Sequence, residues 1–235
     1  MGASASPLVE TRELTKIYPR KREAPVVAVN GVNMKIFPEE FLAIVGRSGC
    51  GKTTLLNLIG ALDRPTSGTV IFGSKNLGNL SSGDLALLRR EKMGFIFQTF
   101  NLLPSLTAFE NIEVALAPTQ MSRGERKEKV KTLLESLKLL DKAEHLPLEL
   151  SAGQQQKVAI ARAMARDPPL ILADEPTGEM DPMTAEEIAA KLVELNHKHN
   201  VTVVVTSHGT FPYKLAKRVL FMTDGKIVSQ EQAGY

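Results

Sequence analysis

The sequence predicts an α/β fold with a parallel sheet at its core, interrupted by a mostly helical insertion over about 100–165. Short apolar runs rich in β-branched residues alternate with helix-like segments outside this insertion, which is typical of parallel α/β sheets. Within the insertion, a charged stretch carries apolar residues at helical spacing. These residues are Val130, Leu133, Leu134 and Leu137.

The expected strands are short apolar or alternating runs, several of them bounded by glycine or turn residues. They lie at about 8–17, about 26–37, Phe41–Val45, Gly68–Gly73, Met93–Phe97, Leu170–Ala173, Val201–Thr206 and Val219–Thr223. A helix before the strand at 201–206 shows one apolar face in Ile188, Leu192 and Leu195. The dipeptide Asp224-Gly225 predicts a tight hairpin turn after the last of these strands.

The composition allows one substantial core, or one core with a subdomain, because 43% of the 235 residues are hydrophobic. A formal net charge of +3 gives no strong signal for binding a polyanion, so no specific nucleic acid is expected. Basic residues gather near the N-terminus, and we interpret them as a solvated face. They are Arg12, Lys16, Arg20, Lys21 and Arg22.

No apolar run approaches the roughly 18–20 residues that cross a bilayer, and the N-terminus lacks the apolar core of a secretory signal. We therefore expect a cytoplasmic protein that reaches a membrane only through a partner. Cys50 is the only cysteine, which excludes an intrachain disulfide and indicates a reducing compartment.

Residues 46–54 form a candidate phosphate-binding loop between the strand at 41–45 and a helix that opens with the apolar stretch 55–59. Its glycines let backbone N–H groups converge on an anion, and the helix N-terminus adds a favourable dipole. Lys52 supplies a point charge for the β- and γ-phosphates, and the Thr53 hydroxyl is placed to bind Mg²⁺. A glycine-rich turn with a chance lysine is the alternative, but the complete motif in this setting favours a nucleoside triphosphate. The predicted nucleotide contacts are Gly46, Ser48, Gly49, Cys50, Gly51, Lys52, Thr53 and Thr54.

Cys50 lies inside this loop at a helix N-terminus, a setting that activates cysteine thiols. We expect an exposed thiol that maleimide reagents modify and that MgATP protects.

A second chemical centre follows the apolar strand Leu170–Ala173, which delivers Asp174 and Glu175 at its C-terminal end. Open α/β sheets bind ligands at this edge. Adjacent strand residues point in opposite directions, so Asp174 can hold Mg²⁺ while Glu175 addresses the attacking water. Two solvated acids that cap a strand are the alternative, which the phosphate loop upstream disfavours.

Three polar positions gain meaning only in this context. The Gln98 amide can contact both Mg²⁺ and water, and His208 can contact a γ-phosphate or hold Glu175. Ser151 and the N–H groups of residues 152–154 form a second anion-binding helix start. Taken alone, these positions would be a surface amide, a structural histidine and a capping serine.

Together these features resemble the ATP-binding-cassette (ABC) ATPase family over nearly the whole chain. Residues 46–53 resemble its Walker A motif, and residues 170–174 its Walker B motif. The resemblance implies ATP hydrolysis with Glu175 as general base, Gln98 as the Q-loop glutamine and His208 as the switch histidine. Catalysis is expected from Glu175, His208, Gln98 and Lys52, and Mg²⁺ binding from Thr53, Gln98 and Asp174.

Two further segments fit this family. Residues 150–154 resemble its signature sequence, which implies that Ser151, Gly153 and Gln154 contact nucleotide, and residues 178–181 resemble its D-loop. Tyr18 lies at the place of the aromatic residue that stacks on adenine, although a tyrosine on the sheet surface is also compatible. The stretches 56–68, 98–104 and 173–178 are similar to the lipoprotein-release and macrolide-export branch (LolD and MacB types).

The family fold implies a single ATP-binding domain over residues 1–235. It has a P-loop NTPase core with a parallel sheet, an N-terminal antiparallel β-subdomain and an inserted α-helical subdomain. We expect the core with its β-subdomain at about 8–99 and 166–235, and the helical subdomain, including the signature, at about 100–165.

The sequence departs from the family pattern at three places. Ala152 replaces the first glycine of Leu-Ser-Gly-Gly-Gln, which narrows backbone freedom beside the phosphate and is expected to slow turnover. Glu179-Met180 stands in the D-loop where small or amide residues are commoner, and Gly209 stands where aspartate usually follows the histidine. These departures affect the expected dimer contacts rather than the groups assigned to chemistry.

The phosphate loop and Ser151 cannot hold one γ-phosphate within a single chain if the insertion keeps the signature away from the core. A head-to-tail homodimer with ATP sandwiched between the two motifs solves this, and hydrolysis then opens it. The resemblance also implies a transmembrane permease, docked near the Q-loop, that holds the chain at the cytoplasmic face of the membrane. Phe100, Leu102, Leu103 and Leu106 are candidates for the docking groove and, equally, for the subdomain core.

Two other classes stay open. A soluble ABC ATPase acting in DNA repair or translation resembles either coiled-coil insertions or two cassettes in one chain, whereas 235 residues hold one cassette. A small-molecule kinase would share the phosphate loop but has no use for residues 150–154. Transfer of labelled phosphate to an acceptor would favour the kinase, and co-purification with a membrane protein the transporter.

Overall fold

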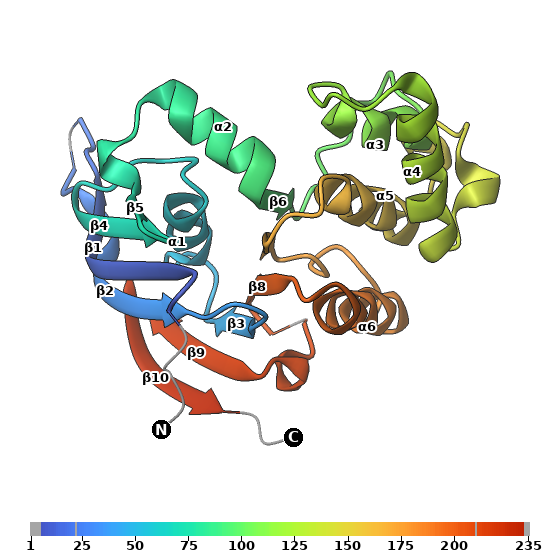
Figure 1. Ribbon diagram of the computed structural model, residues 1–235. Helices are drawn as coiled ribbons and strands as arrows, with labels where there is room; N and C mark the ends of the chain where they lie inside the picture. Colours follow the sequence, from blue (N-terminus) through green and yellow to red (C-terminus); the bar gives the residue numbers. More distant parts are fainter. Residues whose placement is uncertain (1–5, 22, 210, 233–235) are drawn as a thin grey trace, which may run out of the picture.

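The computed structural model describes residues 6–21, 23–209 and 211–232, so Arg22 lies outside the described residues. The strands are β1 (Val9–Tyr18), β2 (Val26–Ile36), β3 (Phe41–Val45), β4 (Ser67–Phe72), β5 (Lys75–Asn76), β6 (Met93–Ile96), β7 (Leu170–Asp174), β8 (Thr202–Ser207), β9 (Arg218–Thr223) and β10 (Lys226–Gln232). The helices are α1 (Lys52–Ile59), α2 (Ser82–Lys92), α3 (Ala108–Leu116), α4 (Arg123–Ser136), α5 (Ala152–Met164) and α6 (Pro182–His199). The strands form two sheets, and helices α3, α4 and α5 gather to one side of them (Figure 1).

The larger sheet has six strands in the order β10-β9-β3-β8-β7-β6. Its neighbours from β9 to β6 are parallel, and β10 pairs antiparallel with β9 across the Asp224-Gly225 turn. Alternate residues of β7 pack into cores on opposite faces, with Leu172 on the α1 side and Ile171 on the α6 side. The predicted parallel core and the predicted hairpin are both confirmed.

The smaller sheet is antiparallel, with four strands in the order β2-β1-β4-β5. It contains the two strands expected at about 8–17 and 26–37. Helix α1 lies between the two sheets (Figure 1) and shares one hydrophobic core with both of them. Leu55, Leu58 and Ile59 of α1 are at most 1% exposed in that core. The phosphate loop, which precedes α1, is thereby anchored from two sides.

Helices α3, α4 and α5 form a separate lobe beside the larger sheet (Figure 1). Val130, Leu134 and Leu137 are buried in its core, and Leu133 is partly buried, as their helical spacing predicts. Each helix of the lobe begins with a capping box. The paired residues are Thr107 and Glu110, Ser122 and Glu125, and Ser151 and Gln154.

Helix α2 has no counterpart among the expected elements between the strands at 68–73 and 93–97. Ser81 caps it through a capping box with Asp84, and Leu85 and Leu88, three residues apart, are its buried residues. The capping signal was present in the sequence, but so narrow an apolar stripe among charged residues carries little helical periodicity.

Among the described residues, none of the helices has the length and apolar character that crossing a bilayer requires.

Candidate nucleotide-binding site

The phosphate loop follows a path from β3 to α1 that excludes any side chain at two of its glycines. Gly51 has a φ of 107°, and a Cβ there would lie 2.0 Å from the Ala28 carbonyl oxygen. At Gly46 a Cβ would lie 2.3 Å from the Met222 carbonyl oxygen. Strands β2 and β9 therefore press against the loop, and only glycine permits this close approach.

Lys52 places a buried positive charge in this loop, with only 3% of its side chain exposed. Its Nζ donates to the carbonyl oxygens of Gly46 at 2.9 Å and Arg47 at 3.1 Å. The same Nζ lies 3.3 Å from Oε1 of Glu175. The ammonium thus connects the phosphate loop with the acid that follows β7.

Asp174 ends β7 and accepts two hydroxyl hydrogen bonds through Oδ1. Thr53 donates from 3.1 Å and Thr206 from 2.6 Å. Thr206 lies opposite Asp174 in the pairing of β7 with β8, and its Oγ1 also accepts the backbone N–H of Glu175 at 3.0 Å. Sequence reasoning missed Thr206, because its contribution depends on the register between two strands that are distant in the chain.

This oxygen-only donor set fits Mg²⁺. Magnesium in phosphate sites is commonly held by one or two carboxylates together with phosphate oxygens and water. The Thr53 hydroxyl and the Asp174 carboxylate already lie within hydrogen-bond distance of each other beside the loop.

Glu175 leaves β7 in a left-handed conformation, with a φ of 45°. Its carboxylate lies between two groups: Oε1 is near Lys52, and Oε2 lies 2.6 Å from Nδ1 of His208. The Glu175 side chain is 13% exposed and that of His208 is 37% exposed. Of the two roles left open for His208, this contact favours holding Glu175 in position.

Gln98, two residues beyond the end of β6, contacts the segment that resembles a D-loop. Its Nε2 donates to Oε1 of Glu179 at 2.8 Å. The departure at Glu179 therefore has a structural partner within the same chain. The amide oxygen of Gln98 can accept a hydrogen bond or bind a metal ion.

Tyr18 ends β1 and, with 38% exposure, lines the same cavity as the phosphate loop. Its hydroxyl donates to Oδ2 of Asp63 at 2.8 Å.

Lys16, predicted to be part of a solvated face, instead pairs with the Asp63 carboxylate at 2.7 Å, and its side chain is only 14% exposed. That interpretation is wrong for Lys16.

A cavity of about 720 Å³ joins most of the predicted site residues. Its lining comprises Tyr18, Val26, Val27, Ala28, Ser48, Gly49, Cys50, Gly51, Lys52, Thr53, Thr54, Gln98, Glu175, His208, Asp224 and Gly225. The residues from β2 and from the β9–β10 turn were not predicted. Their signal is absent from local sequence, because they enter the site by tertiary approach: the Gly225 N–H donates to the Cys50 carbonyl at 2.9 Å.

The family model described as ABC transporter matches residues 29–178. Over 229 residues the chain is 42% identical to the uncharacterized ABC transporter ATP-binding protein MJ0796 of Methanocaldococcus jannaschii, covering 96% of this chain and 97% of that protein. The chain belongs to the ABC transporter family. Its cassette is also similar to a solved dimeric structure of MJ0796 bound to ADP and Pi, with a TM-score of 0.89 at 41% identity, covering 97% of this chain and 99% of that one.

A second relative places the cassette in the expected branch. It is 44% identical over 223 residues to the macrolide export ATP-binding/permease protein MacB of Hyphomonas neptunium. The match covers 95% of this chain but 34% of that protein, so the chain spans about a third of this exporter's length.

These similarities confirm the predicted fold class. The cassette combines the parallel P-loop NTPase core, the antiparallel β-subdomain and the inserted α-helical subdomain. It is an ATPase of this family.

The signature segment of the cassette lies apart from the cavity. Within the described residues, the lining of the cavity includes none from 100–165. Ser151 and Gln154 instead bond to each other at the start of α5: the Ser151 N–H donates to Oε1 of Gln154 at 2.9 Å, and the Gln154 N–H donates to Oγ of Ser151 at 3.4 Å. Gly153 packs against α6, where a Cβ would lie 2.6 Å from a methyl of Thr184.

Cys50 corrects one expectation. The residue is 8% exposed, and its side chain belongs to the core shared by α1 and the two sheets. The prediction of an exposed thiol is therefore wrong. A position at a helix N-terminus does not determine whether a side chain points outward or under the loop, and here a Cβ on Gly46 would meet the Cys50 Sγ at 2.6 Å.

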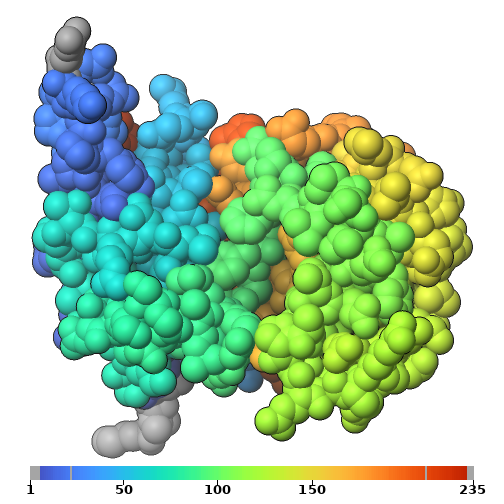
Figure 2. Space-filling model, turned by 90° about the horizontal axis from the view of Figure 1, so that it is seen from above, coloured from blue at the N-terminus to red at the C-terminus, as the bar shows by residue number. Residues whose placement is uncertain are grey.

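A hollow of about 510 Å³ separates α2 from the helical lobe, and Figure 2 shows it between their surfaces. Its apolar lining includes Leu62, Phe95, Phe97 and Val114. Its charged lining consists of Arg89, Arg90, Arg162 and Arg166, and no acidic residue among the described residues lines it. The NH1 group of Arg166 is buried without a hydrogen-bond partner.

The four apolar residues predicted for a docking groove do not line this hollow. Leu102 packs against the core of the lobe, which supports the core alternative for that residue. Leu103 is 44% exposed. Its backbone N–H donates to Oδ1 of the buried Asn111 side chain at 2.7 Å, and Nδ2 of Asn111 donates to the Leu103 carbonyl oxygen at 3.1 Å. A docking role for the other three residues stays a prediction.

Proposed function

We propose that the cavity beside the phosphate loop binds MgATP and that Glu175 acts as general base on the water that attacks the γ-phosphate. The observation that carries this proposal is the assembly of Lys52, Asp174, Glu175 and His208 at the C-terminal edge of β3, β7 and β8. Lys52 binds the β- and γ-phosphates, and the loop N–H groups surround them.

Each remaining group has a defined task in this proposal. Thr53, Asp174 and Gln98 would hold Mg²⁺, which neutralises phosphate charge when bound. Thr206 fixes the Asp174 carboxylate and the backbone of Glu175. The contact of 2.6 Å between His208 Nδ1 and Glu175 Oε2 limits rotation of the Glu175 carboxylate. The carboxylate would thereby stay oriented toward the attacking water.

The separation of the signature from the cavity supports a head-to-tail homodimer. In it, Ser151, Gly153 and Gln154 of one chain would face the phosphates in the cavity of the other. The solved MJ0796 structure is described as dimeric and bound to ADP and Pi, which is the arrangement such a mechanism requires after hydrolysis. Loss of the intact γ-phosphate weakens the charge-assisted bonds across the interface and lets the pair separate.

We further propose that the cassette powers a permease that exports a substrate or extracts it from the membrane, docked from the cytoplasmic face into the hollow between α2 and the lobe. MacB carries ATP-binding and permease functions under one name. The apolar lining and the four arginines of the hollow fit a short permease helix with an apolar face and a carboxylate.

The proposed docking predicts that permease binding and basal hydrolysis can be separated. Val114→Asp places a charge in the hollow at a residue 42% exposed, and we expect lost co-purification with the permease while the isolated cassette keeps its ATPase rate. Leu148→Asp is the matched control, because Leu148 is 92% exposed and lies outside the hollow. Equal loss of permease binding in both variants would remove the hollow from the proposal.

A further inference from the structure

Tyr18 is held by a pair of charged side chains that the cavity does not touch. One carboxylate, that of Asp63, accepts from the Tyr18 hydroxyl at 2.8 Å and from Lys16 Nζ at 2.7 Å. The Lys16 Nζ also lies over the Tyr18 ring, 4.9 Å from its centroid. A lysine, a carboxylate and a phenol therefore close a ring of contacts around one aromatic side chain.

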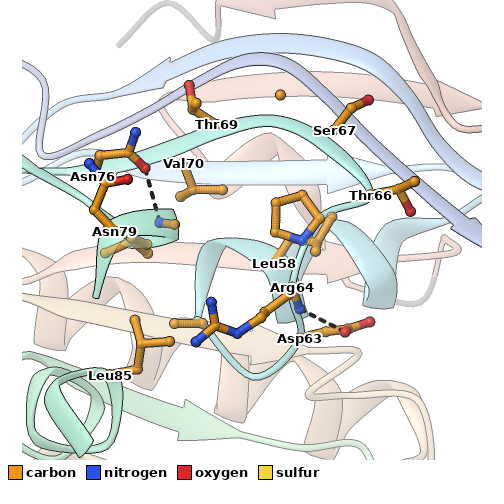
Figure 3. A pocket seen from close by; sticks show the side chains of 15 residues that line it. Leu58, Asp63, Arg64, Thr66, Ser67, Thr69, Val70, Asn76, Asn79 and Leu85 are labelled. Atoms are coloured by element: carbon orange, nitrogen blue, oxygen red, sulfur yellow. Dashed lines mark hydrogen bonds between the residues drawn. The ribbon is translucent and has the colours of Figure 1, made fainter. Parts of the chain in front are cut away.

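This cluster is anchored to the helix that carries the phosphate loop. Asp63 follows the C-terminal end of α1, and the Arg64 N–H donates to its Oδ1 at 2.7 Å, a bond visible in Figure 3. Lys16 Nζ donates at 2.7 Å to the carbonyl oxygen of Arg64 as well. Two donors from β1 thus converge on one turn, which fixes the end of β1 relative to α1.

Asp63 is ionised at neutral pH in this setting. Burial raises its pKa, but the hydrogen bonds from Lys16, Tyr18 and the Arg64 N–H outweigh burial, and the pKa of Asp63 is lowered. The pKa of the Tyr18 hydroxyl is raised, first by burial and then by its bond to Asp63. The phenol therefore stays protonated and serves as a donor to a carboxylate, which is a strong pairing.

Tyr18 is the member of this cluster that borders the nucleotide cavity, and 38% of it is exposed. Lys16 and Asp63 do not line that cavity. Because the Lys16 ammonium lies over one face of the ring, a flat ligand that enters the cavity would stack on the opposite face. A second cavity, of about 330 Å³, lies beside Asp63 and Arg64 and contains no part of the phosphate loop (Figure 3).

We propose that Asp63 and Lys16 are positioning residues for the nucleotide base: they lock the Tyr18 ring in one orientation, so that the face opposite Lys16 stacks on adenine. The inference rests on the proposed ATP site, since the ring acts only if a base enters the cavity. The hydroxyl bond fixes the rotation of the ring, and the ammonium holds its far face by a cation–π contact. A side chain ordered before binding loses less entropy when the ligand arrives.

The test is a double-mutant cycle on MgADP affinity, measured by isothermal titration calorimetry. ADP is used because it has the base but no γ-phosphate to drive hydrolysis. Tyr18→Ala should weaken binding on the order of tenfold to a hundredfold, as loss of a base-stacking ring does. Asp63→Ala and Lys16→Met should each weaken it by about two- to tenfold through loss of preorganisation.

The decisive comparison is the effect of Asp63→Ala with and without Tyr18. In the Tyr18→Ala background, a residue that acts only through the ring should change MgADP affinity by less than about twofold. Lys191→Met is the matched control for Lys16→Met, because Lys191 also binds one carboxylate, of Glu194 at 2.6 Å, and one carbonyl, of Ser136 at 3.0 Å. It should leave MgADP affinity unchanged.

Three results would overturn the proposal. The first is an unchanged affinity in both Asp63→Ala and Lys16→Met; the second is an equal loss with and without Tyr18, which would assign Asp63 to the fold of the turn. The third is full affinity in Tyr18→Ala while Lys52→Ala abolishes binding, which removes the stacking role and leaves the phosphate site standing. Absence of MgADP binding in the unmodified chain would instead contradict the proposed function itself.

Discussion

The proposed ATP site has two regions, one around the phosphate loop and one at the signature. They differ in how many of their contacts lie within a single chain. Around the phosphate loop, Lys52, Asp174, Glu175, Thr206 and His208 bond to one another from three neighbouring strands and the loops that follow them. At the signature, the side chains of Ser151 and Gln154 bond within the first turn of α5, and to nothing else in the described part of the chain. In the proposed mechanism the first region binds phosphates by itself, whereas the second offers N–H groups to an anion supplied by another molecule.

The largest effect on activity is expected from a substitution in the first region, around the phosphate loop. Lys52→Ala removes the buried ammonium that contacts both the loop carbonyls and Glu175. We expect ATP binding and phosphate release to fall to background, since the β- and γ-phosphates lose their main side-chain partner. Binding of labelled ATP by filter retention checks this, and a variant that retains the parent affinity would contradict the role given to Lys52.

Ser151→Arg tests the other region and should separate binding from hydrolysis. Because Ser151 does not line the cavity, MgADP affinity of the single chain should change by less than about twofold, while ATP hydrolysis is lost. The bulky cation would intrude where the second chain presents its phosphates. Hydrolysis at the parent rate would show that the signature takes no part in the reaction.

Thr206→Val tests whether the contact network, rather than the carboxylates alone, defines the first region. The change removes the donor to Asp174 and the acceptor of the Glu175 N–H. We expect a loss of about 10–100-fold in the apparent Mg²⁺ affinity of ATP hydrolysis, as for other groups that orient metal ligands. Magnesium titration of the rate measures this.

Thr202→Val is the matched control for this change. Thr202 is 1% exposed at the opposite end of β8, where its hydroxyl accepts the Glu39 N–H at 3.0 Å. Its removal should leave the magnesium dependence unchanged. Equal shifts in both variants would indicate a general loss of packing in β8.

The smallest effect is expected at the contact between α5, which carries the signature, and the segment that follows Glu175. Gln156 of α5 donates through Nε2 to the Pro176 carbonyl at 2.7 Å, and the residue is fully buried. Gln156→Leu should lower the free energy of unfolding by about 1 kcal/mol, the usual net contribution of one hydrogen bond, and should spare ADP binding. Urea denaturation measures the first and calorimetry the second. Gln155→Leu, which loses a bond to the Leu150 carbonyl within the same helix start, is the control for general effects on α5.

The sequence predicts the site residues that form local motifs, but not the residues that reach the site through tertiary contacts. The phosphate loop is one run of consecutive residues and Asp174-Glu175 is another, so the place of each at a strand end follows from local patterns. Thr206, Ala28 and Gly225 enter the site through strand register or backbone approach, which no local pattern records. Helix α2 was missed because two buried leucines give too little periodicity.

The error at Cys50 has a different cause. A position in a loop at a helix N-terminus fixes the backbone but not the direction of the side chain, and here the thiol packs into the core. The roles of Ser151, Gly153 and Gln154 remain predictions from family resemblance, because they concern a contact between chains.

The central claim is that the cavity of one chain and the signature of another complete a single site. Size-exclusion chromatography of Glu175→Gln with and without MgATP tests it most directly. The change keeps the shape of the side chain but removes the general base, a contribution typically on the order of 10²–10⁴-fold in rate, so ATP persists in the site. We predict a dimer with MgATP, a monomer without it, and a monomer under both conditions when Ser151→Arg is added. A Glu175→Gln chain that stays monomeric at saturating MgATP, or a double variant that still dimerises, would contradict it.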